Sequence, residues 1–153
     1  MEDLNDKFLL RVMTYNIHGC IGADRVVNPD KIAAIIVDLD VDIIALQEVD
    51  AGHPTREYRN QAQMIAGVLG VEHIYFPVEQ EGLRRFGLAV LSRFPIVGFD
   101  QIRLPNVYPL LNPRRRGVLC ATLETPAGPV CLINTHLSLF RLERRLQLNA
   151  LMS

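Results

Sequence analysis

The feature that most constrains the fold is a short run, residues 41–46, which is apolar at every position except Asp42. A run of this length bounded by polar residues fits a strand, and its apolar residues fall on both faces of that strand. Such strands are buried on both sides, at the centre of a sheet that other layers cover. The sequence therefore predicts a central strand here, with packed layers on both of its faces.

Two segments with helical periodicity lie on either side of this strand. Asn28 and Pro29 mark the start of the first, because asparagine is a favoured N-cap and proline is tolerated at the first helical position. Its apolar side chains recur every three or four residues: Ile32, Ile35, Ile36 and Leu39. The second helix is expected from about Arg59 to Leu69, and Gly70 is expected to end it.

The other apolar runs are typical of strands, and they cover residues 8–17, 71–76, 86–91, 96–104, 117–123 and 130–135. Turn residues over 125–129 join the last two as a hairpin. A closing helix is expected over residues 139–151, with Leu139, Leu142 and Leu146 facing the core. Helical crossovers early and antiparallel strands later predict an α+β fold with a mixed sheet, preceded by a polar tail over residues 1–7.

Composition narrows the class of protein and its compartment. The chain has 153 residues, of which 49% are hydrophobic and 22% charged, as in a single globular domain. The longest purely apolar run, residues 32–37, is far too short to span a membrane. Three cysteines without C-x-x-C spacing suggest neither a disulfide framework nor a zinc site, so the cytoplasm is the expected location. Cys120 and Cys131 lie in strand-like runs, where we expect buried thiols.

Three polar residues, Asn16, Glu48 and His136, stand at the ends of strand-like runs. Mg²⁺ prefers oxygen ligands and is usually held by one or two carboxylates plus substrate phosphate, so Glu48 is expected to be a metal ligand. Asn16 can orient Glu48 or bind a phosphate oxygen. His136 can stabilise the charge that develops on a phosphoryl oxygen. The combination predicts part of the active site of a Mg²⁺-dependent phosphoesterase.

Each of these residues also has a structural interpretation. An isolated asparagine at a strand end is commonly a turn residue, and an isolated glutamate after a strand is commonly solvated. His136 taken alone fits a hydrogen-bonded structural role, and His18, His53 and His73 are expected to be surface or hydrogen-bonded histidines. The functional prediction therefore depends on the combination and not on any single residue.

Arginines form two groups in the second half of the chain. Residues 1–76 carry six basic and twelve acidic groups, whereas residues 77–153 carry ten basic and five acidic groups. The two arginine groups are Arg114 to Arg116, and Arg141, Arg144 and Arg145 at helical spacing. A solvated helix face is the favoured interpretation. Phosphate contact is the alternative, although a nucleic-acid surface would carry more stacking aromatic residues.

Four motifs occur in an order that resembles the endonuclease/exonuclease/phosphatase superfamily, which includes deoxyribonuclease I, abasic-site endonucleases, sphingomyelinases and inositol polyphosphate 5-phosphatases. They are the segments 13–17 (MTYNI), 42–48 (DIIALQE), 89–96 (AVLSRFPI) and 134–137 (NTHL). The resemblance implies that residues 8–153 are the N-terminal portion of a deoxyribonuclease I-like domain, a four-layer α-β-β-α sandwich. By the same resemblance Glu48 would be a metal ligand for Mg²⁺ or Mn²⁺, Asn16 a metal-site or phosphate-site residue, and His136 a contact to the scissile phosphate.

The chain departs from the family pattern in its second half. The family's Gly-Asp-x-Asn motif and its terminal Ser-Asp-His motif do not occur in the sequence. The resemblance therefore implies a truncated chain that is inactive, or nearly so, by itself. Because the missing half would cover apolar surface of the first half, we expect a soluble form to be a homodimer or larger, or to be completed by another polypeptide.

Two hypotheses about function follow. The first is a metal-dependent hydrolase of phosphate esters, of which this chain carries part of the active site. The second is a binding or assembly module that keeps the fold without catalysis. The substrate stays open among nucleic acid, a phospholipid headgroup and an inositol phosphate, because specificity in such folds lies in variable loops.

Overall fold

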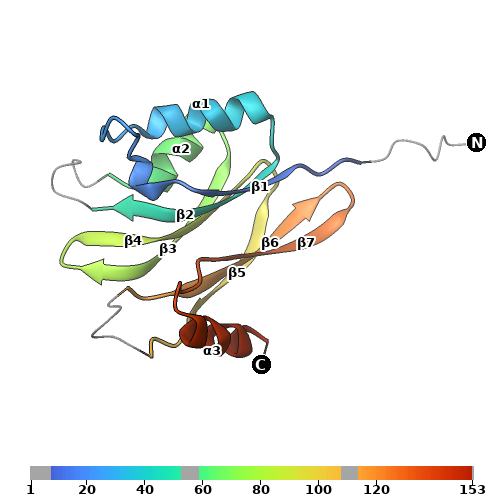
Figure 1. Ribbon diagram of the computed structural model, residues 1–153. Helices are drawn as coiled ribbons and strands as arrows, with labels where there is room; N and C mark the ends of the chain where they lie inside the picture. The colour runs from blue at the N-terminus through green and yellow to red at the C-terminus, as the bar shows by residue number, and fades with distance from the viewer. Residues whose placement is uncertain (1–7, 53–58, 108–113, 153) are drawn as a thin grey trace, which may run out of the picture.

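The computed structural model describes residues 8–52, 59–107 and 114–152 (Figure 1). Its elements are, in chain order, β1 (Val12–Asn16), a 3₁₀ turn η1 (His18–Cys20), α1 (Pro29–Leu39), β2 (Ile43–Ala51), α2 (Gln61–Leu69), β3 (Glu72–Glu81), β4 (Arg84–Ser92), β5 (Ile96–Arg103), β6 (Gly117–Thr125), β7 (Gly128–Thr135) and α3 (Arg141–Leu151). The predicted α+β class is confirmed. His53, one of the histidines singled out in the sequence, lies outside the described residues.

The strands form two sheets, as the α-β-β-α sandwich implied by the family resemblance requires. The first sheet has the order β1-β2-β4-β3, with β1 parallel to β2 and the other pairs antiparallel, and the second has the order β5-β6-β7 and is antiparallel. β2 is central in the first sheet and buried along almost its whole length, as its apolar sequence predicted. Residues 79–85, which separate two of the expected strand runs, form the tip of the β3–β4 hairpin, so both strands are longer than expected.

The layers follow the order helix, sheet, sheet, helix (Figure 1). One core lies between the first sheet and the helices α1 and α2, and it includes Ile36, Leu46 and Ile65. A second core lies between the two sheets and includes Val90 and Leu119. The arrangement confirms the expected deoxyribonuclease I-like architecture as a partial fold. Within the described residues, no helix is long and apolar enough to cross a bilayer.

Side-chain caps explain where the first two helices begin. Asn28 Oδ1 accepts a hydrogen bond of 3.0 Å from the backbone N–H of Lys31, and Pro29 follows as the first helical residue. Asn60 caps α2 in the same way, accepting from Ala62, so this helix begins at Gln61, within two residues of its expected start. Both helices therefore start where the local sequence satisfies their first N–H groups.

α3 has the opposite orientation from the one its sequence predicted. Leu139 and Leu142 are 87% and 53% exposed and Leu146 is also exposed, whereas Glu143 and Gln147 are fully buried. The Glu143 carboxylate accepts a hydrogen bond from the backbone N–H of Val107 (3.0 Å). Polar side chains face inward because they satisfy backbone groups of irregular segments beside the helix. The prediction of an inward leucine face was therefore wrong.

Gln147 makes the corresponding contacts one turn later. Its Oε1 accepts from the N–H of Ser138 (2.9 Å), and its Nε2 donates to the carbonyl of Pro105 (3.1 Å).

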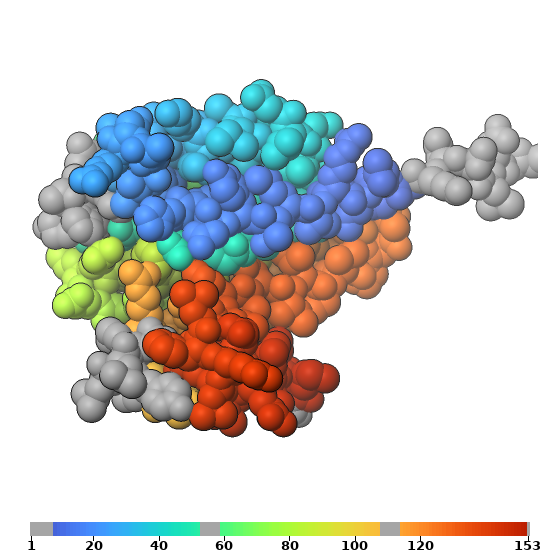
Figure 2. Space-filling view, in the orientation of Figure 1, coloured from blue at the N-terminus to red at the C-terminus, as the bar shows by residue number. Residues whose placement is uncertain are grey.

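The C-terminal segment lies on the side of the molecule opposite α1 (Figure 2). The leucines of α3 thus leave an apolar surface on that side of the described chain.

Two further side-chain environments differ from expectation. Arg144 does not belong to a solvated face, because its guanidinium donates to the carbonyls of Ser138 (2.9 Å) and Leu139 (3.2 Å). Cys131 is exposed and Cys120 half-buried, although both were expected to be buried. Cys131 lies beside Thr122 on the face of the second sheet that points away from the first sheet, where few described side chains cover it.

An ion cluster joins the ends of β1, β2 and β4 that lie far from Glu48. Arg93 donates to Asp40 (2.8 Å) and to Asp42 (3.2 Å), and Arg11 contacts Asp40 (3.2 Å). The Arg93 guanidinium, through its hydrogen bond and its charge, holds the pKa of the Asp40 carboxyl below its usual value. Asp42 and Arg93, which belong to two of the four motifs, therefore support the fold at a distance from the other motif residues.

We expect Arg93→Gln to lower the free energy of unfolding at neutral pH more than in acid. The depressed pKa of Asp40 means that its ion pair contributes stability above the unfolded pKa of about 3.9 and loses it as the pH falls through the lower folded value. Urea unfolding at pH 7 and at pH 3 measures this, with the exposed Arg145→Gln as the control. An equal effect of Arg93→Gln at both pH values would contradict the account.

Candidate functional site

Glu48 lies inside β2, at a bulge, and not after the strand as the sequence suggested. Gln47 pairs with Leu88 and Val49 with Gly87, so Glu48 is the extra residue, and its φ is +57°. Bulges interrupt the alternation of side chains and re-aim them, and they are common beside active sites. Leu46 and Val49 can both pack in the helix-side core because Glu48 breaks the alternation. As a result, the Glu48 carboxylate does not point into either buried face of the sheet.

Both oxygens of this carboxylate accept hydrogen bonds from residues at the end of β1 and just after it. Asn16 Nδ2 donates to Glu48 Oε1 (3.0 Å), and His18 Nδ1 lies 3.0 Å from Glu48 Oε2. Asn16 Oδ1 in turn accepts from the backbone N–H of His18 (3.0 Å), which fixes the orientation of its amide. β1 and β2 are parallel neighbours, so their equivalent ends bring Asn16 and Glu48 together.

These contacts set the protonation of Glu48. Its partial burial alone would raise the pKa, but the hydrogen bonds from Asn16 and His18 and the positive charge that His136 carries in acid outweigh that effect, so the pKa of Glu48 lies below its usual value. Glu48 is therefore ionised at neutral pH. An ionised carboxylate at a strand bulge is an effective ligand for a hard cation.

A buried hydrogen-bond bridge behind Glu48 joins the two sheets. Gln47 Nε2 donates to Asn134 Oδ1 (2.8 Å), and Asn134 Nδ2 donates to the carbonyls of Leu46 and Ala89 (both 2.9 Å). Gln47 also donates to Thr14 Oγ1 on β1 (3.0 Å). These contacts fix the end of β7 against β2. His136, two residues after Asn134, is held on the same side of the sandwich as Glu48.

His136 and Arg116 complete the cluster. His136 Nδ1 lies 3.8 Å from Glu48 Oε1, which is a charge contact and not a hydrogen bond. Burial and the neighbouring Arg116 guanidinium lower the pKa of His136, although Glu48 acts in the opposite direction. Arg116 precedes β6 and is half-buried, and its Nε–H is buried without a hydrogen-bond partner among the described residues. A cationic side chain with a spare donor is thus placed beside the imidazole.

The donor set is compatible with a hard metal ion anchored by one carboxylate. Glu48, Arg116 and His136 line a hollow of about 20 Å³, enough for about one water-sized group. Within the described residues there is no cluster of three acidic, histidine or cysteine side chains that would enclose a metal completely. Mg²⁺ suits such a site, because it keeps several waters and needs only one or two protein carboxylates.

The structure brings together the three residues singled out in the sequence, Asn16, Glu48 and His136. Sequence reasoning missed His18, which was expected to be a surface histidine; its side chain is 74% exposed, yet it contacts Glu48. It also missed Arg116, which was placed in a solvated basic run. The spacing of His18, two residues after Asn16, was a usable signal. For Arg116 there was none, because its neighbours Arg114 and Arg115 have the same chemistry and are exposed.

Comparisons with known proteins bear on this fold and site. The family model described as Endonuclease/Exonuclease/phosphatase family matches residues 13–152. A curated protein, cwh43 of Schizosaccharomyces pombe, is 27% identical over 135 residues, which are 87% of this chain and 13% of that protein.

Solved structures that are similar to this chain point to the same family. An endonuclease/exonuclease/phosphatase from Beutenbergia cavernae is 27% identical with a TM-score of 0.77, and the match covers 94% of this chain and 43% of that one. The human Nocturnin catalytic domain, solved with a bound sulfate anion, is 25% identical with a TM-score of 0.69, at 94% and 56% coverage. ANGEL2, solved with adenosine-2',3'-vanadate, shares the fold at 19% identity, a TM-score of 0.63 and coverage of 94% and 47%. This chain therefore spans about half the length of these structures, and far less of the curated relative.

Proposed function

Because the chain belongs to the endonuclease/exonuclease/phosphatase family, we propose that it carries part of the active site of a Mg²⁺-dependent phosphoesterase. The observation that supports this most is the convergence of Asn16 at the end of β1, Glu48 at the bulge in β2 and His136 just after β7. Arg116 adds a cationic group at the same place. If each of these residues had only a separate structural role, their side chains would have no reason to lie close together.

In this proposal Glu48 holds the metal, and Asn16 and His18 hold Glu48 in place through its two oxygens. When bound, Mg²⁺ would polarise the phosphoryl group and help to generate the attacking water. His136 would donate a hydrogen bond to a phosphoryl oxygen, which a neutral imidazole can do from one of its two nitrogens. Arg116 would donate to the same phosphate from its guanidinium. The phosphate would lie across the mouth of the hollow, because the hollow itself holds only about one water.

The names of the structural neighbours support a phosphate ester as the substrate. ANGEL2 is described as a 2',3'-cyclic phosphatase, and Nocturnin was solved with a sulfate anion, which has the shape and charge of a phosphate. Nucleic acid, phospholipid headgroup and inositol phosphate all contain such a group.

The test is metal binding by the purified chain and by Glu48→Gln. We expect Mg²⁺ or Mn²⁺ to bind the unaltered chain, and Glu48→Gln to weaken that binding at least about ten-fold, because a neutral amide replaces the anionic ligand. Calorimetry measures the affinity directly. It needs no catalytic turnover, which we expect to be absent or nearly so in this chain alone.

Glu124→Gln is the matched control. Glu124 is exposed near the end of β6 remote from Gly117, so its replacement changes the net charge equally without touching the site. Equal weakening by both variants would point to nonspecific charge effects. Absence of metal binding in the unaltered chain would favour the alternative, a binding or assembly module of the same fold.

The apolar surface of α3 bears on the partners we propose. Leu139, just before α3, and Leu142 on α3 face solvent, and Ile133 is 54% exposed on the outer face of the second sheet. Apolar surface of this kind favours association. A homodimer, or completion by another polypeptide, therefore stays a prediction that sedimentation can check, and the cytoplasm stays the proposed location.

A further inference from the structure

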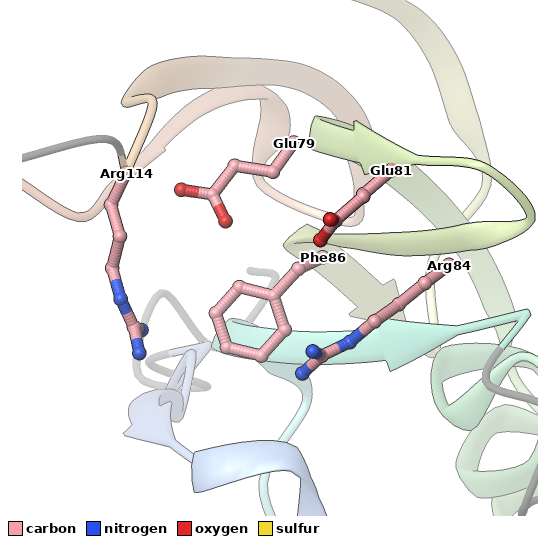
Figure 3. Close-up of a pocket in the computed structure, with 5 residues that line it drawn as sticks. All are labelled: Glu79, Glu81, Arg84, Phe86 and Arg114. Carbon is pink, nitrogen blue, oxygen red and sulfur yellow. The ribbon is translucent and has the colours of Figure 1, made fainter. Parts of the chain in front are cut away.

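A second cavity opens beside the hollow at Glu48 and His136. It has a volume of about 230 Å³ and is lined by Glu79, Glu81, Arg84, Phe86 and Arg114 (Figure 3). Glu79 and Phe86 line both the cavity and the hollow, so the two are adjacent. A group esterified to a phosphate at the hollow would reach this cavity. Its volume is below that of a pocket for a drug-sized ligand, so it suits one ring-sized group.

The register of the β3–β4 hairpin explains why these side chains converge. Glu79 pairs directly with Phe86, and Glu81 pairs directly with Arg84. Residues paired across two strands lie on the same face, and so do residues two apart along one strand. The hairpin tip therefore presents all four side chains on one face. Arg114 comes from the segment before β6, and its guanidinium carbon lies 5.8 Å from the centre of the Phe86 ring.

The charges in the cavity are mixed. Figure 3 shows the carboxylates of Glu79 and Glu81 and the guanidinium groups of Arg84 and Arg114 arranged around the Phe86 ring. Within the described residues, no side-chain hydrogen bond or ion pair engages Glu79 or Glu81. Arg84 forms an ion pair with the buried Asp50, in which Nη2 lies 3.9 Å from Oδ2. Acceptors and donors are therefore both available to a ligand.

These charges argue against a ligand group that carries a net charge. A cationic headgroup would be repelled by the guanidinium groups of Arg84 and Arg114, which both line the cavity. A second phosphate would meet the carboxylates of Glu79 and Glu81. A neutral planar group with donors on one edge and acceptors on another would satisfy both kinds of residue and stack on the ring.

We propose that this cavity is a nucleobase subsite, with guanine as its best ligand. Guanine presents neighbouring N–H donors to a carboxylate and the neighbouring acceptors O6 and N7 to a guanidinium. Phe86 provides a stacking face, as aromatic side chains do for bases in single-stranded recognition. The inference rests on the proposed function, because it assigns the cavity to the group esterified to the phosphate. The substrate class is then a guanine nucleotide or a nucleic acid.

The test is an NMR titration of the purified chain with Mg²⁺ and four ligands: guanosine 5'-monophosphate, inosine 5'-monophosphate, inositol 1-phosphate and inorganic phosphate. We expect the guanine nucleotide to bind about ten-fold more tightly than phosphate, which is a typical effect of stacking one base. Inosine monophosphate, which lacks the exocyclic amino group, should bind about five-fold more weakly than the guanine nucleotide. The shifts that distinguish the guanine nucleotide from phosphate should centre on Arg84 and Phe86.

Two variants assign the effect to the cavity. Phe86→Leu should remove the advantage of the guanine nucleotide over phosphate, measured as the ratio of the two affinities in the same variant, because Phe86 also borders the hollow. Glu81→Gln, at an exposed position that cannot disturb the core, should bring the guanine and inosine nucleotides to equal affinity. Glu124→Gln should change neither.

Three results would overturn the inference. They are equal affinity for the guanine nucleotide and phosphate, equal affinity for the guanine and inosine nucleotides, or tighter binding of inositol 1-phosphate, which would assign the cavity to a polyol. If the proposed function itself were wrong, the pattern of NMR shifts would differ from these three results. Phosphate would then cause no shifts at Glu48 and His136, while the guanine nucleotide would still shift Arg84 and Phe86.

Discussion

Replacing Asn134 with leucine is expected to lower the free energy of unfolding by about 3 kcal/mol or more and to move His136. The substitution leaves Gln47 Nε2 without one acceptor and the carbonyls of Leu46 and Ala89 without the Asn134 donor. Each buried polar group that loses its partner costs about 1–3 kcal/mol. Because Asn134 ties β7 to β2, its loss also releases the residue two positions later. Urea unfolding measures the first effect and the imidazole NMR signals of His136 the second.

Asn149→Leu is the control for this substitution. Asn149 is exposed on α3, so the same chemical change there removes no buried hydrogen bond. We expect a change within about 0.5 kcal/mol, as for most surface substitutions. If Asn134→Leu were equally mild, or if the His136 signals did not move, the bridge would not be what positions the imidazole.

Gly87→Ala is the second substitution with a large expected effect. A Cβ at this position would lie 1.9 Å from the carbonyl oxygen of Phe76 and 3.0 Å from the backbone nitrogen of Val78. Backbone atoms of a paired strand cannot turn away as a side chain can. The β3–β4 pairing must therefore shift, and we expect a loss of at least about 3 kcal/mol, at the upper end of overpacking effects.

The same substitution should also disturb Glu48. Gly87 pairs with Val49, directly after the bulge, so a shift of β4 moves the strand that carries the carboxylate. Metal affinity in the remaining folded protein should fall together with stability. Gly67→Ala is the matched control, since a Cβ at that position would have no neighbour within 4 Å and alanine favours the helix interior by about 0.5–1 kcal/mol. A tolerated Gly87→Ala would mean that the hairpin adapts more easily than its register implies.

Much of the fold follows from local sequence signals. The helix starts at Asn28 and near Asn60 could be predicted because a cap is a contact between residues two or three positions apart. β2 could be predicted as central because its apolar residues occupy both faces. Asn16, Glu48 and His136 could be singled out because each is a polar residue at or near the end of an apolar, strand-like run.

The features that sequence analysis did not predict depend on contacts distant in the chain. The burial of Glu143 and Gln147 is explained by backbone groups at Val107, Pro105 and Ser138, which no periodicity along α3 reveals. The bulge at Glu48 depends on the register of β4. Arg116 was separated from Arg114 and Arg115 only by its position beside His136. In each case the amino acids were visible in the sequence, but their surroundings were set by another segment.

The bridge between Gln47 and Asn134 has a consequence for how such a protein can change over time. The groups that would bind metal and phosphate are positioned by the same hydrogen bonds that dock one sheet on the other. The geometry of the site and the packing of the two sheets therefore depend on the same contacts. A substitution that loosens the packing of the sheets far from Glu48 should weaken ligand affinity as well. New specificity would then arise more readily at the β3–β4 hairpin tip, which can vary without separating the sheets.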